Sequence, residues 1–330
     1  MFKKTVVASA AAALFALVGS VHAQQTDDYT VQVVAGTVGF DQIQPFMAEQ
    51  LKLWDKYKVK VKLTAGNYQR SNQILSIGEF DVGYDQIANS IRYNSAGIDN
   101  TIVAPSSVNC SMIVSAPAVK SWSDLKGKRV GISTKFDVQY LTLTHYILPR
   151  FGLSPTDVQL IPVASPEAAT ALLTGNVGAV FTFAPYGVFA VEKGAHALLP
   201  ADQLIDKKDI ASGMLRNSMI MSKKFIKEHP ELAKRMVWAH MDAVNIMRKD
   251  PSVGIQTILH YQPNLDPGLL KKASQNCGWV YDEVPKVWID TLIKWMKEDN
   301  LLRKPVKYED VAYPDLAKSY PGYPGYEKIK

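Results

Sequence analysis

The chain has 330 residues, a formal net charge of +6, 47% hydrophobic residues and 21% charged residues. This composition argues against a disordered chain or a fibre, and the absence of a fixed-period repeat argues against a solenoid. The basic residues are scattered rather than gathered in a stripe with aromatic residues, which argues against nucleic-acid binding. At roughly 100–200 residues per domain, the length favours two domains.

The first 23 residues have the pattern of a cleavable secretory signal. Lys3 and Lys4 precede a small and apolar run from Val6 to Val18, and Val21-His22-Ala23 forms a processing site. We therefore predict a signal peptide at 1–23, with cleavage before Gln24 and export to the periplasm. The run is too short to span a bilayer comfortably, and no other stretch reaches about 18 apolar residues. The remaining chain is expected to be soluble.

Strands and helices alternate from residue 29 onward. Strands are predicted at Tyr29–Ala35, Val59–Leu63, Phe80–Gly83 and Ile102–Ala104, each followed by a helical or turn segment. Alternation of this kind is typical of an open, largely parallel sheet with helices on both faces.

A second α/β unit follows Met112–Ser115. Strands are predicted at Arg129–Ser133, Val158–Val163, Gly178–Phe183 and His196–Leu199. Asp137 is expected to cap one helix, and Ser165 to cap another that has Pro166 at its first position. One more strand is expected at Asn217–Ser222, and the rest of the chain is helical, including a long amphipathic segment at Glu231–Lys249.

This order of elements predicts two lobes. The first lobe comprises 24–112 and 222–330, and the second comprises 113–221. Two segments near Cys110–Ser115 and Asn217–Ser222 are expected to cross between them, so that the lobes can hinge. Ligands of open α/β sheets bind at the carboxyl ends of strands, which here face each other across a cleft.

Four stretches resemble a known family. They are Ser121–Gly131 (SWSDLKGKRVG), Gly78–Gly83 (GEFDVG), Ala171–Val180 (ALLTGNVGAV) and His229–Ala233 (HPELA). Together they are similar to the periplasmic aliphatic-sulfonate, taurine and nitrate binding proteins of ABC importers, within the superfamily of thiamine-pyrimidine-precursor-like proteins. Family members usually carry Asp-Ala where this chain has Gly178-Ala179.

The resemblance implies a fold, a ligand class and a partner. It implies a periplasmic binding protein of type II, a monomer that closes on a small organic anion and delivers it to the transmembrane subunits of an ABC permease. It implies no catalytic residue, cofactor or metal.

Candidate binding residues in the first lobe follow its strands. They are Thr37, Phe40, Tyr84, Gln86, Ser107 and Asn109. The alternative for these positions is an ordinary turn, and for the neighbouring Asp85 a helix cap.

In the second lobe, the loop Ser133, Thr134, Lys135 and Phe136 precedes a helix, where free backbone N–H groups suit an anion. Lys135 either adds a positive charge to the anion site or is solvated at the surface. Tyr186 can stack on a flat ligand, whereas Phe183 is assigned to the core.

Arg216 precedes the second crossing segment. It can pair with a carboxylate or sulfonate through two hydrogen bonds, or bridge the lobes structurally.

The sequence contains two cysteines, Cys110 and Cys277, and export permits a disulfide between them, which the sequence leaves open. Ser123–Lys126 matches S-x-x-K, but the partner motifs of that enzyme class are missing. The expected ligand is a sulfonate or carboxylate, and Tyr84, Phe136 and Tyr186 suggest an aromatic one. The alternatives are the binding protein of a tripartite ion-driven carrier, and a pyrimidine- or heterocycle-binding protein or enzyme on the same fold.

Overall fold

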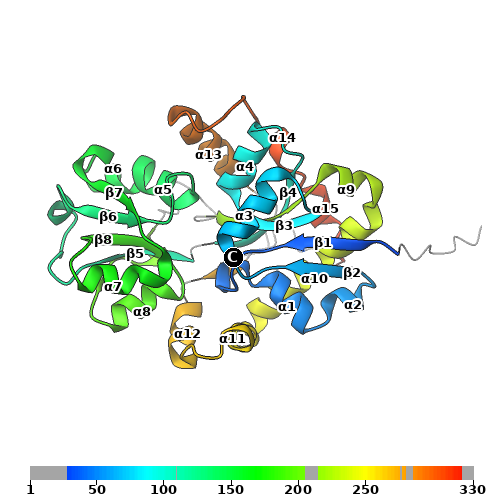
Figure 1. The fold of residues 1–330 in the computed structure, drawn as a ribbon, viewed down its shortest axis with the longest axis horizontal. Helices are drawn as coiled ribbons and strands as arrows, with labels where there is room; N and C mark the ends of the chain where they lie inside the picture. The colour runs from blue at the N-terminus through cyan, green and yellow to red at the C-terminus, as the bar shows by residue number, and fades with distance from the viewer. Residues whose placement is uncertain (1–27, 109, 205–214, 276, 280–284, 322–330) are drawn as a thin grey trace, which may run out of the picture.

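The computed structural model describes residues 28–108, 110–204, 215–275, 277–279 and 285–321. These residues form two α/β lobes that lie side by side, each with its own sheet between helices (Figure 1). The two lobes are therefore as predicted, whereas the sheets are mixed rather than largely parallel.

The six-stranded sheet of the first lobe has the order β11-β4-β10-β3-β1-β2. Its neighbours β1, β2 and β3 are parallel, as the alternation of strands and helices predicts. β10 comes from much later in the chain and lies antiparallel between β3 and β4. The strands are β1 (Thr30–Val34), β2 (Lys60–Thr64), β3 (Val82–Gln86), β4 (Thr101–Val108), β10 (Leu215–Met221) and β11 (Gly278–Trp279).

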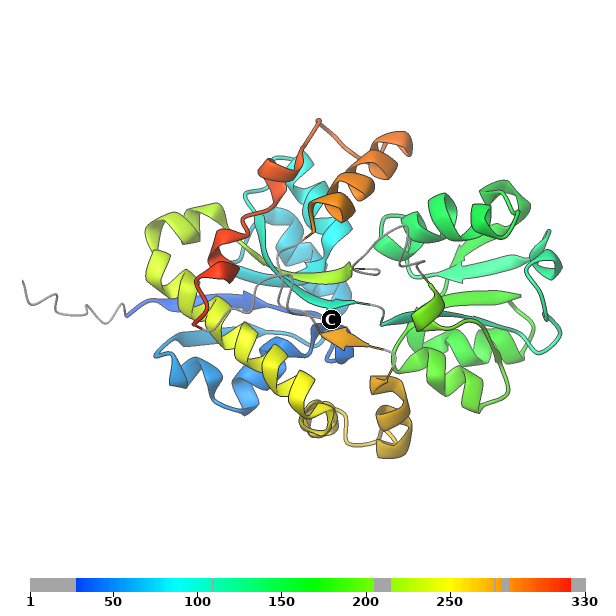
Figure 2. The same ribbon diagram turned by 180° about the vertical axis from the view of Figure 1, so that it is seen from behind.

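Helices from both ends of the chain cover this sheet. They are α1 (Gln44–Gln50), α2 (Leu53–Lys56), α3 (Tyr68–Ile77), α4 (Ile87–Ser95), α9 (Lys223–Glu228), α10 (Pro230–Lys249), α11 (Pro251–Tyr261), α12 (Pro267–Ser274), α13 (Lys286–Glu298), α14 (Tyr308–Val311) and α15 (Asp315–Lys318). The long helix α10 crosses the back of the lobe (Figure 2) and packs on α1, α2 and β4. Its apolar face includes Leu232, Met236 and Met247, which are fully or almost fully buried.

The five-stranded sheet of the second lobe has the order β7-β6-β8-β5-β9. β6 is parallel to β7 and β8, and β5 is antiparallel to β8 and β9. The strands are β5 (Ser111–Ser115), β6 (Arg129–Ile132), β7 (Gln159–Pro162), β8 (Ala179–Phe183) and β9 (His196–Leu199). The helices are α5 (Val138–Thr142), α6 (Leu148–Arg150), α7 (Ala168–Leu173) and α8 (Tyr186–Glu192), with a π-helical turn at Leu143–Ile147.

One connection between the lobes differs from the prediction. β4 in the first sheet ends at Val108 and β5 in the second begins at Ser111, so the first crossing falls between these two strands. β10 pairs with β3 and β4, so Leu215–Met221 lies in the first sheet, although the sequence analysis placed 215–221 in the second lobe. Asn217–Ser222 is therefore not the second crossing. The error arose because an isolated strand pattern does not reveal its partner strand.

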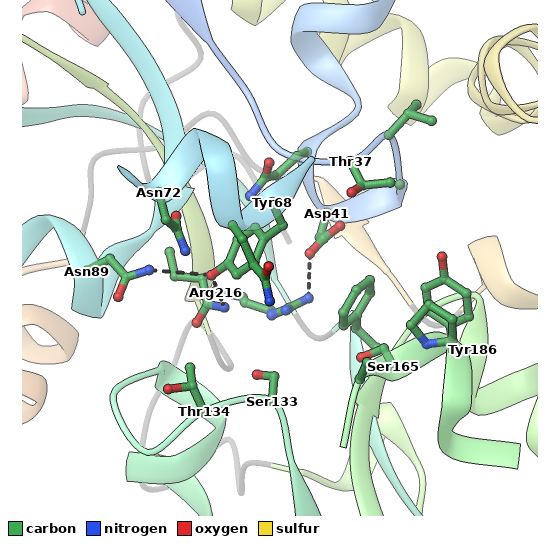
Figure 3. Close-up of a pocket in the computed structure, with 18 of the residues that line it drawn as sticks. Thr37, Asp41, Tyr68, Asn72, Asn89, Ser133, Thr134, Ser165, Tyr186 and Arg216 are labelled. Atoms are coloured by element: carbon green, nitrogen blue, oxygen red, sulfur yellow. Dashed lines mark hydrogen bonds and ion pairs between the residues drawn. The ribbon is translucent and has the colours of Figure 1, made fainter. Parts of the chain in front are cut away.

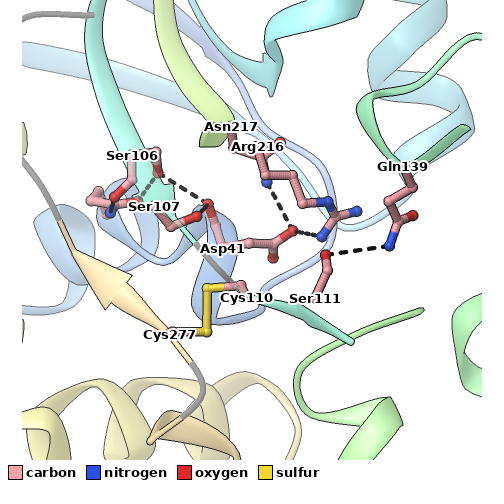
Figure 4. Close-up of a disulfide and its surroundings, with 10 residues drawn as sticks. Asp41, Ser106, Ser107, Cys110, Ser111, Gln139, Arg216, Asn217 and Cys277 are labelled. Atoms are coloured by element: carbon pink, nitrogen blue, oxygen red, sulfur yellow. Dashed lines mark hydrogen bonds and ion pairs between the residues drawn. A yellow bond between two sulfur atoms is a disulfide. The ribbon is translucent and has the colours of Figure 1, made fainter. Parts of the chain in front are cut away.

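A disulfide joins Cys110, in the first crossing, to Cys277, directly before β11 (Figure 4). The disulfide that the sequence left open is therefore present. The C-terminal segment is thereby fixed to the connection between the lobes. Two first-lobe helices also touch the second lobe, since α12 contacts α8 and α13 contacts α5.

Candidate functional site

A cleft with a cavity volume of about 460 Å³ lies between the lobes. Its walls come from the carboxyl ends of strands in both sheets and the loops that follow them (Figure 3). The first lobe contributes Thr37, Val38, Gly39, Asp41, Gln42, Tyr68, Gln69, Asn72, Gln86, Asn89, Arg92 and Arg216. The second contributes Ser133, Thr134, Ala164, Ser165, Pro166, Phe183, Pro185 and Tyr186.

The loop after β1 forms one edge of the cleft. Thr37 lines the cavity, as expected for its position. The Gly36 N–H donates to Gln42 Oε1 at 3.1 Å. A Cβ at Gly36 would lie 3.0 Å from that oxygen and 3.1 Å from the Tyr68 ring, so glycine permits the close approach. Phe40 was expected at the site, but it is wholly buried and belongs to the core of the first lobe.

Arg216, at the start of β10, lines the cavity with a side chain that is only 4% exposed. Its Nη1 forms an ion pair with Asp41 Oδ2, and the Asn217 side chain donates to the same oxygen at 2.8 Å. Its guanidinium lies 4.1 Å from the ring centroid of Phe183 in the second lobe. Arg216 therefore has a fixed orientation, and its Nε is buried without a hydrogen-bond partner among the described residues.

Two serines of β4 hold the turn that carries Asp41. The hydroxyls of Ser106 and Ser107 donate to the Asp41 carbonyl oxygen at 3.0 and 3.1 Å (Figure 4). Ser107 was expected to contact ligand, but it is buried and does not line the cavity. Its hydroxyl supports the turn from behind. Asn109, predicted for the same loop, lies outside the described residues.

A buried hydrogen-bond network lies behind the first-lobe wall. The Tyr68 hydroxyl accepts hydrogen bonds from the side chains of Gln86 at 3.0 Å and Asn89 at 3.4 Å. Asn89 also donates to Asp85 at 3.1 Å, and Asp85 accepts from the Tyr93 hydroxyl at 2.9 Å. Burial raises the pKa of Asp85 to about 6, against the opposing effect of these hydrogen bonds. Burial also raises the pKa of Tyr68, so its hydroxyl stays protonated.

Tyr84 was expected to form a wall of the pocket, and this is wrong. The side chain is 2% exposed and points into the first-lobe core, where its hydroxyl lies 3.3 Å from His240 Nδ1. His240 Nε2 lies 2.8 Å from the carbonyl oxygen of Pro105, which can only accept, so Nε2 carries the proton. Burial lowers the pKa of His240 to about 4. Tyr84 and Gln86 lie on the same face of β3, but Gln86 is the last residue of the strand and reaches the cleft, whereas Tyr84 lies deeper in the sheet.

The loop after β6 provides the facing wall. Ser133 and Thr134 line the cavity, and the amides of Thr134 and Lys135 donate to no acceptor among the described residues. The Lys135 and Phe136 side chains are exposed and do not line the cavity, contrary to expectation. Phe136 instead lies under the guanidinium of Arg92, which is 5.0 Å from its ring centroid. Asp137 caps α5 as predicted, accepting from Tyr140 N at 2.8 Å.

The amides at the start of α5 are already in use. Asp137 accepts from Tyr140, and Gln86 of the first lobe accepts from Val138 N at 3.2 Å. Burial raises the pKa of Asp137, whose other oxygen accepts from the Ser133 hydroxyl. The Thr134 and Lys135 amides of the loop therefore remain available, whereas the Val138 and Tyr140 amides of the helix do not.

Aromatic side chains and prolines form the other end of the second-lobe wall. Tyr186 lines the cavity as predicted, and its ring meets Phe183 edge-on at 5.4 Å. Burial and the nearby Asp41 carboxylate raise the pKa of Tyr186. Phe183 also lines the cavity, so its assignment to the core is wrong. Ser165 was expected to cap a helix, but it makes no cap hydrogen bond and faces the cleft instead.

Sequence reasoning missed eight polar residues of the cleft, namely Asp41, Gln42, Tyr68, Gln69, Asn72, Asn89, Arg92 and Ser165. Tyr68 and Asn72 could have been found, since they follow a predicted strand and the loops after strands face the cleft. Asn89 is the third residue of α4 and Arg92 the sixth, so both lie inside the helix, where the strand-end rule gives no signal.

Within the described ranges, no group of three or more His, Cys, Asp or Glu side chains could hold a metal ion. No helix in the part of the chain that the structure describes is long and apolar enough to cross a membrane. The predicted signal peptide at 1–23 lies outside the described residues.

Comparisons with known proteins agree with this architecture. The model of the family described as "NMT1/THI5 like" matches residues 40–253. The taurine-binding periplasmic protein of Escherichia coli K12 is 24% identical over 152 residues, which cover 45% of this chain and 44% of that protein.

Two solved structures show the same fold. The periplasmic aliphatic sulphonate binding protein SsuA of Escherichia coli has a TM-score of 0.72 at 18% identity, covering 86% of this chain and 92% of that one. The desulfurization enzyme DSZB has a TM-score of 0.64 at 15% identity, covering 88% and 97%. The expected type II periplasmic binding protein fold is confirmed.

Proposed function

Because this chain belongs to the NMT1/THI5-like family, we propose that it is the solute-binding component of an ABC importer and holds a small organic anion between its lobes. The names of its relatives, a taurine-binding and an aliphatic-sulfonate-binding periplasmic protein, support a sulfonate or a carboxylate. The two-lobed fold supports binding by closure, since a cleft between hinged lobes can enclose a ligand.

One observation carries this proposal: free N–H donors from both lobes lie on residues that line one cavity. The first lobe supplies the amide of Thr37 and the second supplies the amide of Thr134, neither of which donates to an acceptor among the described residues. A carboxylate or sulfonate has several acceptor oxygens and no donor, so it complements such a site.

The aromatic end of the cavity favours a flat ligand body. Phe183 and Tyr186 meet edge-on there, and Pro166 and Pro185 add apolar surface. A ring placed against these groups would remove apolar area from water and gain a favourable ring contact. We therefore include aromatic acids in the proposed ligand class.

The proposal is tested by titrating the purified protein, by calorimetry and thermal shift, with benzenesulfonate, benzoate, ethanesulfonate, taurine, nitrate and a set of pyrimidines. Binding of a sulfonate or carboxylate with a micromolar Kd, about −8 kcal/mol, is expected. Binding confined to sugars or organic cations would contradict it.

Location and partners follow from the same proposal. The protein would be a periplasmic monomer after removal of residues 1–23, and its closed form would dock on the permease subunits. A tripartite ion-driven carrier is the alternative partner, and a neighbouring gene for an ATPase would decide against it.

An enzyme on this fold is the remaining alternative. Both cysteines of the chain form the disulfide, so no cysteine thiol is available as a nucleophile. A heterocyclic ligand that is chemically changed on incubation with the protein, as seen by mass spectrometry, would favour this alternative.

A further inference from the structure

Among the charged side chains that line the cleft, one arginine has no carboxylate as an ion-pair partner. Three charged side chains line the cavity: Asp41, Arg92 and Arg216. Asp41 and Arg216 form an ion pair and offset each other. Arg92 forms no ion pair with any described residue, so the residues that line the cavity carry a net charge of +1.

One buried carboxylate, Asp85, interacts with the Arg92 charge through space but forms no ion pair with it. Asp85 lies behind the cleft wall, and its oxygens accept hydrogen bonds from the Gln86 amide at 2.7 Å and from the side chains of Asn89 and Tyr93. Its lone pairs are thus used inside the first lobe, and no contact of ion-pair length joins it to Arg92.

Two contacts fix the position of Arg92. Its Nη2 donates to Asn89 Oδ1, three residues earlier on α4, at 3.1 Å. Its guanidinium lies 5.0 Å from the ring centroid of Phe136. Stacking uses the face of a guanidinium and leaves its edge N–H groups available for a planar or tetrahedral anion.

The stacking contact spans the two lobes. Arg92 belongs to α4 of the first lobe, and Phe136 to the loop between β6 and α5 of the second. Phe136 remains 44% exposed, which is unusual for a large apolar side chain without another role. The contact can exist only while the lobes are close together.

The polar residues near Arg92 mark one end of the cavity. Figure 3 shows Asn72, Asn89 and Thr134 at this end, and Thr37, Ser165 and Tyr186 at the opposite end. We call the end with Asn72, Asn89 and Thr134 the amide-rich end. Arg92 lies there, because it donates a hydrogen bond to Asn89. The aromatic end, formed by Tyr186 and Phe183, is opposite.

We propose that Arg92 receives the acidic group of the ligand at the amide-rich end, with the ligand body directed toward Phe183 and Tyr186, and that its stacking on Phe136 couples anion binding to lobe closure. This inference rests on the proposed function and adds the orientation of the ligand and a specificity-determining residue. Arg216, whose charge is balanced by Asp41, then lies along the ligand body.

The test compares benzenesulfonate with its neutral analogue benzenesulfonamide in calorimetric titrations of the full chain. Arg92→Gln is expected to weaken benzenesulfonate binding by roughly 10- to 100-fold, the loss typical of a hydrogen bond to a charged group, and to leave the sulfonamide nearly unchanged. Arg150→Gln is the matched control, since Arg150 also stacks on a phenylalanine, at 5.2 Å, but on the second-lobe surface. It should bind both compounds as the wild type does.

Phe136→Leu tests the coupling separately, because an exposed side chain can be changed without harming the core. We expect about threefold weaker benzenesulfonate binding, seen as faster dissociation in stopped-flow fluorescence. Arg92→Gln binding benzenesulfonate within twofold of the wild type would overturn the inference while leaving the proposed function standing. A wild type that binds no sulfonate or carboxylate would contradict the proposed function itself.

Discussion

The side-chain oxygen of Gln86, at the end of β3 in the first lobe, accepts a hydrogen bond from the backbone N–H of Val138, the first residue of α5 in the second lobe. The same side chain donates to the Tyr68 hydroxyl that faces the cleft. Gln86 thus joins the two lobes directly beside the ligand cavity.

Replacing Gln86 with leucine should weaken ligand binding. The variant loses the contact between the lobes, and a typical intramolecular hydrogen bond contributes about 1 kcal/mol, so benzenesulfonate binding should weaken about fivefold. Calorimetric titration measures this, with Gln159→Leu on the exposed edge strand β7 as a control. Equal affinities for the two variants would show that the Gln86 contact does not support closure.

Replacing Asp41 with alanine should destabilise the protein strongly. Arg216 would remain buried without its carboxylate, which costs roughly 3–5 kcal/mol. Chemical denaturation measures the free energy of unfolding. The double variant Asp41→Ala, Arg216→Met should recover part of the loss, because it removes the unpaired charge. A loss below about 1 kcal/mol in the single variant would contradict the role given to this pair.

Asp85 should make the protein more stable as the pH falls. Its pKa is about 6 in the folded chain and 3.8 in the unfolded chain, so the folded state binds the proton more tightly. Its stabilising effect is complete below pH 3.8 and is lost as the pH rises through 6, with a total of about 3 kcal/mol. His240 acts in the opposite direction over a similar range, since its pKa is lowered to about 4.

The difference between the wild type and Asp85→Asn isolates the effect of Asp85. The free energy of unfolding of the wild type, relative to the variant, should rise between pH 7 and pH 4. A difference that stays constant with pH would mean that the carboxyl group titrates normally.

Removing the disulfide should lower stability without abolishing the fold. Cys110 and Cys277 are 167 residues apart, and a bridge over a long loop restricts the unfolded chain. The double serine variant should lose about 2–4 kcal/mol of unfolding free energy. Wild type treated with dithiothreitol should unfold at the same denaturant concentration as the variant. If reduction leaves the unfolding midpoint unchanged, the bridge does not contribute to stability.

The sequence was most informative where one local pattern determines one element. The strand at His196–Leu199 and the Asp137 cap of α5 were predicted as the structure has them, because periodicity and cap chemistry are local properties. The long helix was predicted to within one residue for a similar reason. The insertion of β10 between β3 and β4 was missed, since pairing over more than a hundred residues leaves no mark in either strand.

The candidate site shows the same limit. Thr37, Gln86, Ser133, Thr134, Tyr186 and Arg216 were chosen because they lie near strand ends, and the structure places them on the cavity. Tyr84 lies two residues before Gln86 but packs against His240, because the space available at each strand position depends on tertiary packing. Arg92 was missed because its place in the cleft depends on how α4 lies against the second lobe.

The most direct test of an anion-binding cleft is the identity of the small molecule that the protein carries from its native periplasm. Purification without refolding, denaturation and mass spectrometry of the released compound should reveal a sulfonate or carboxylate in near-equimolar amount. A neutral sugar or an organic cation at that stoichiometry would contradict the account.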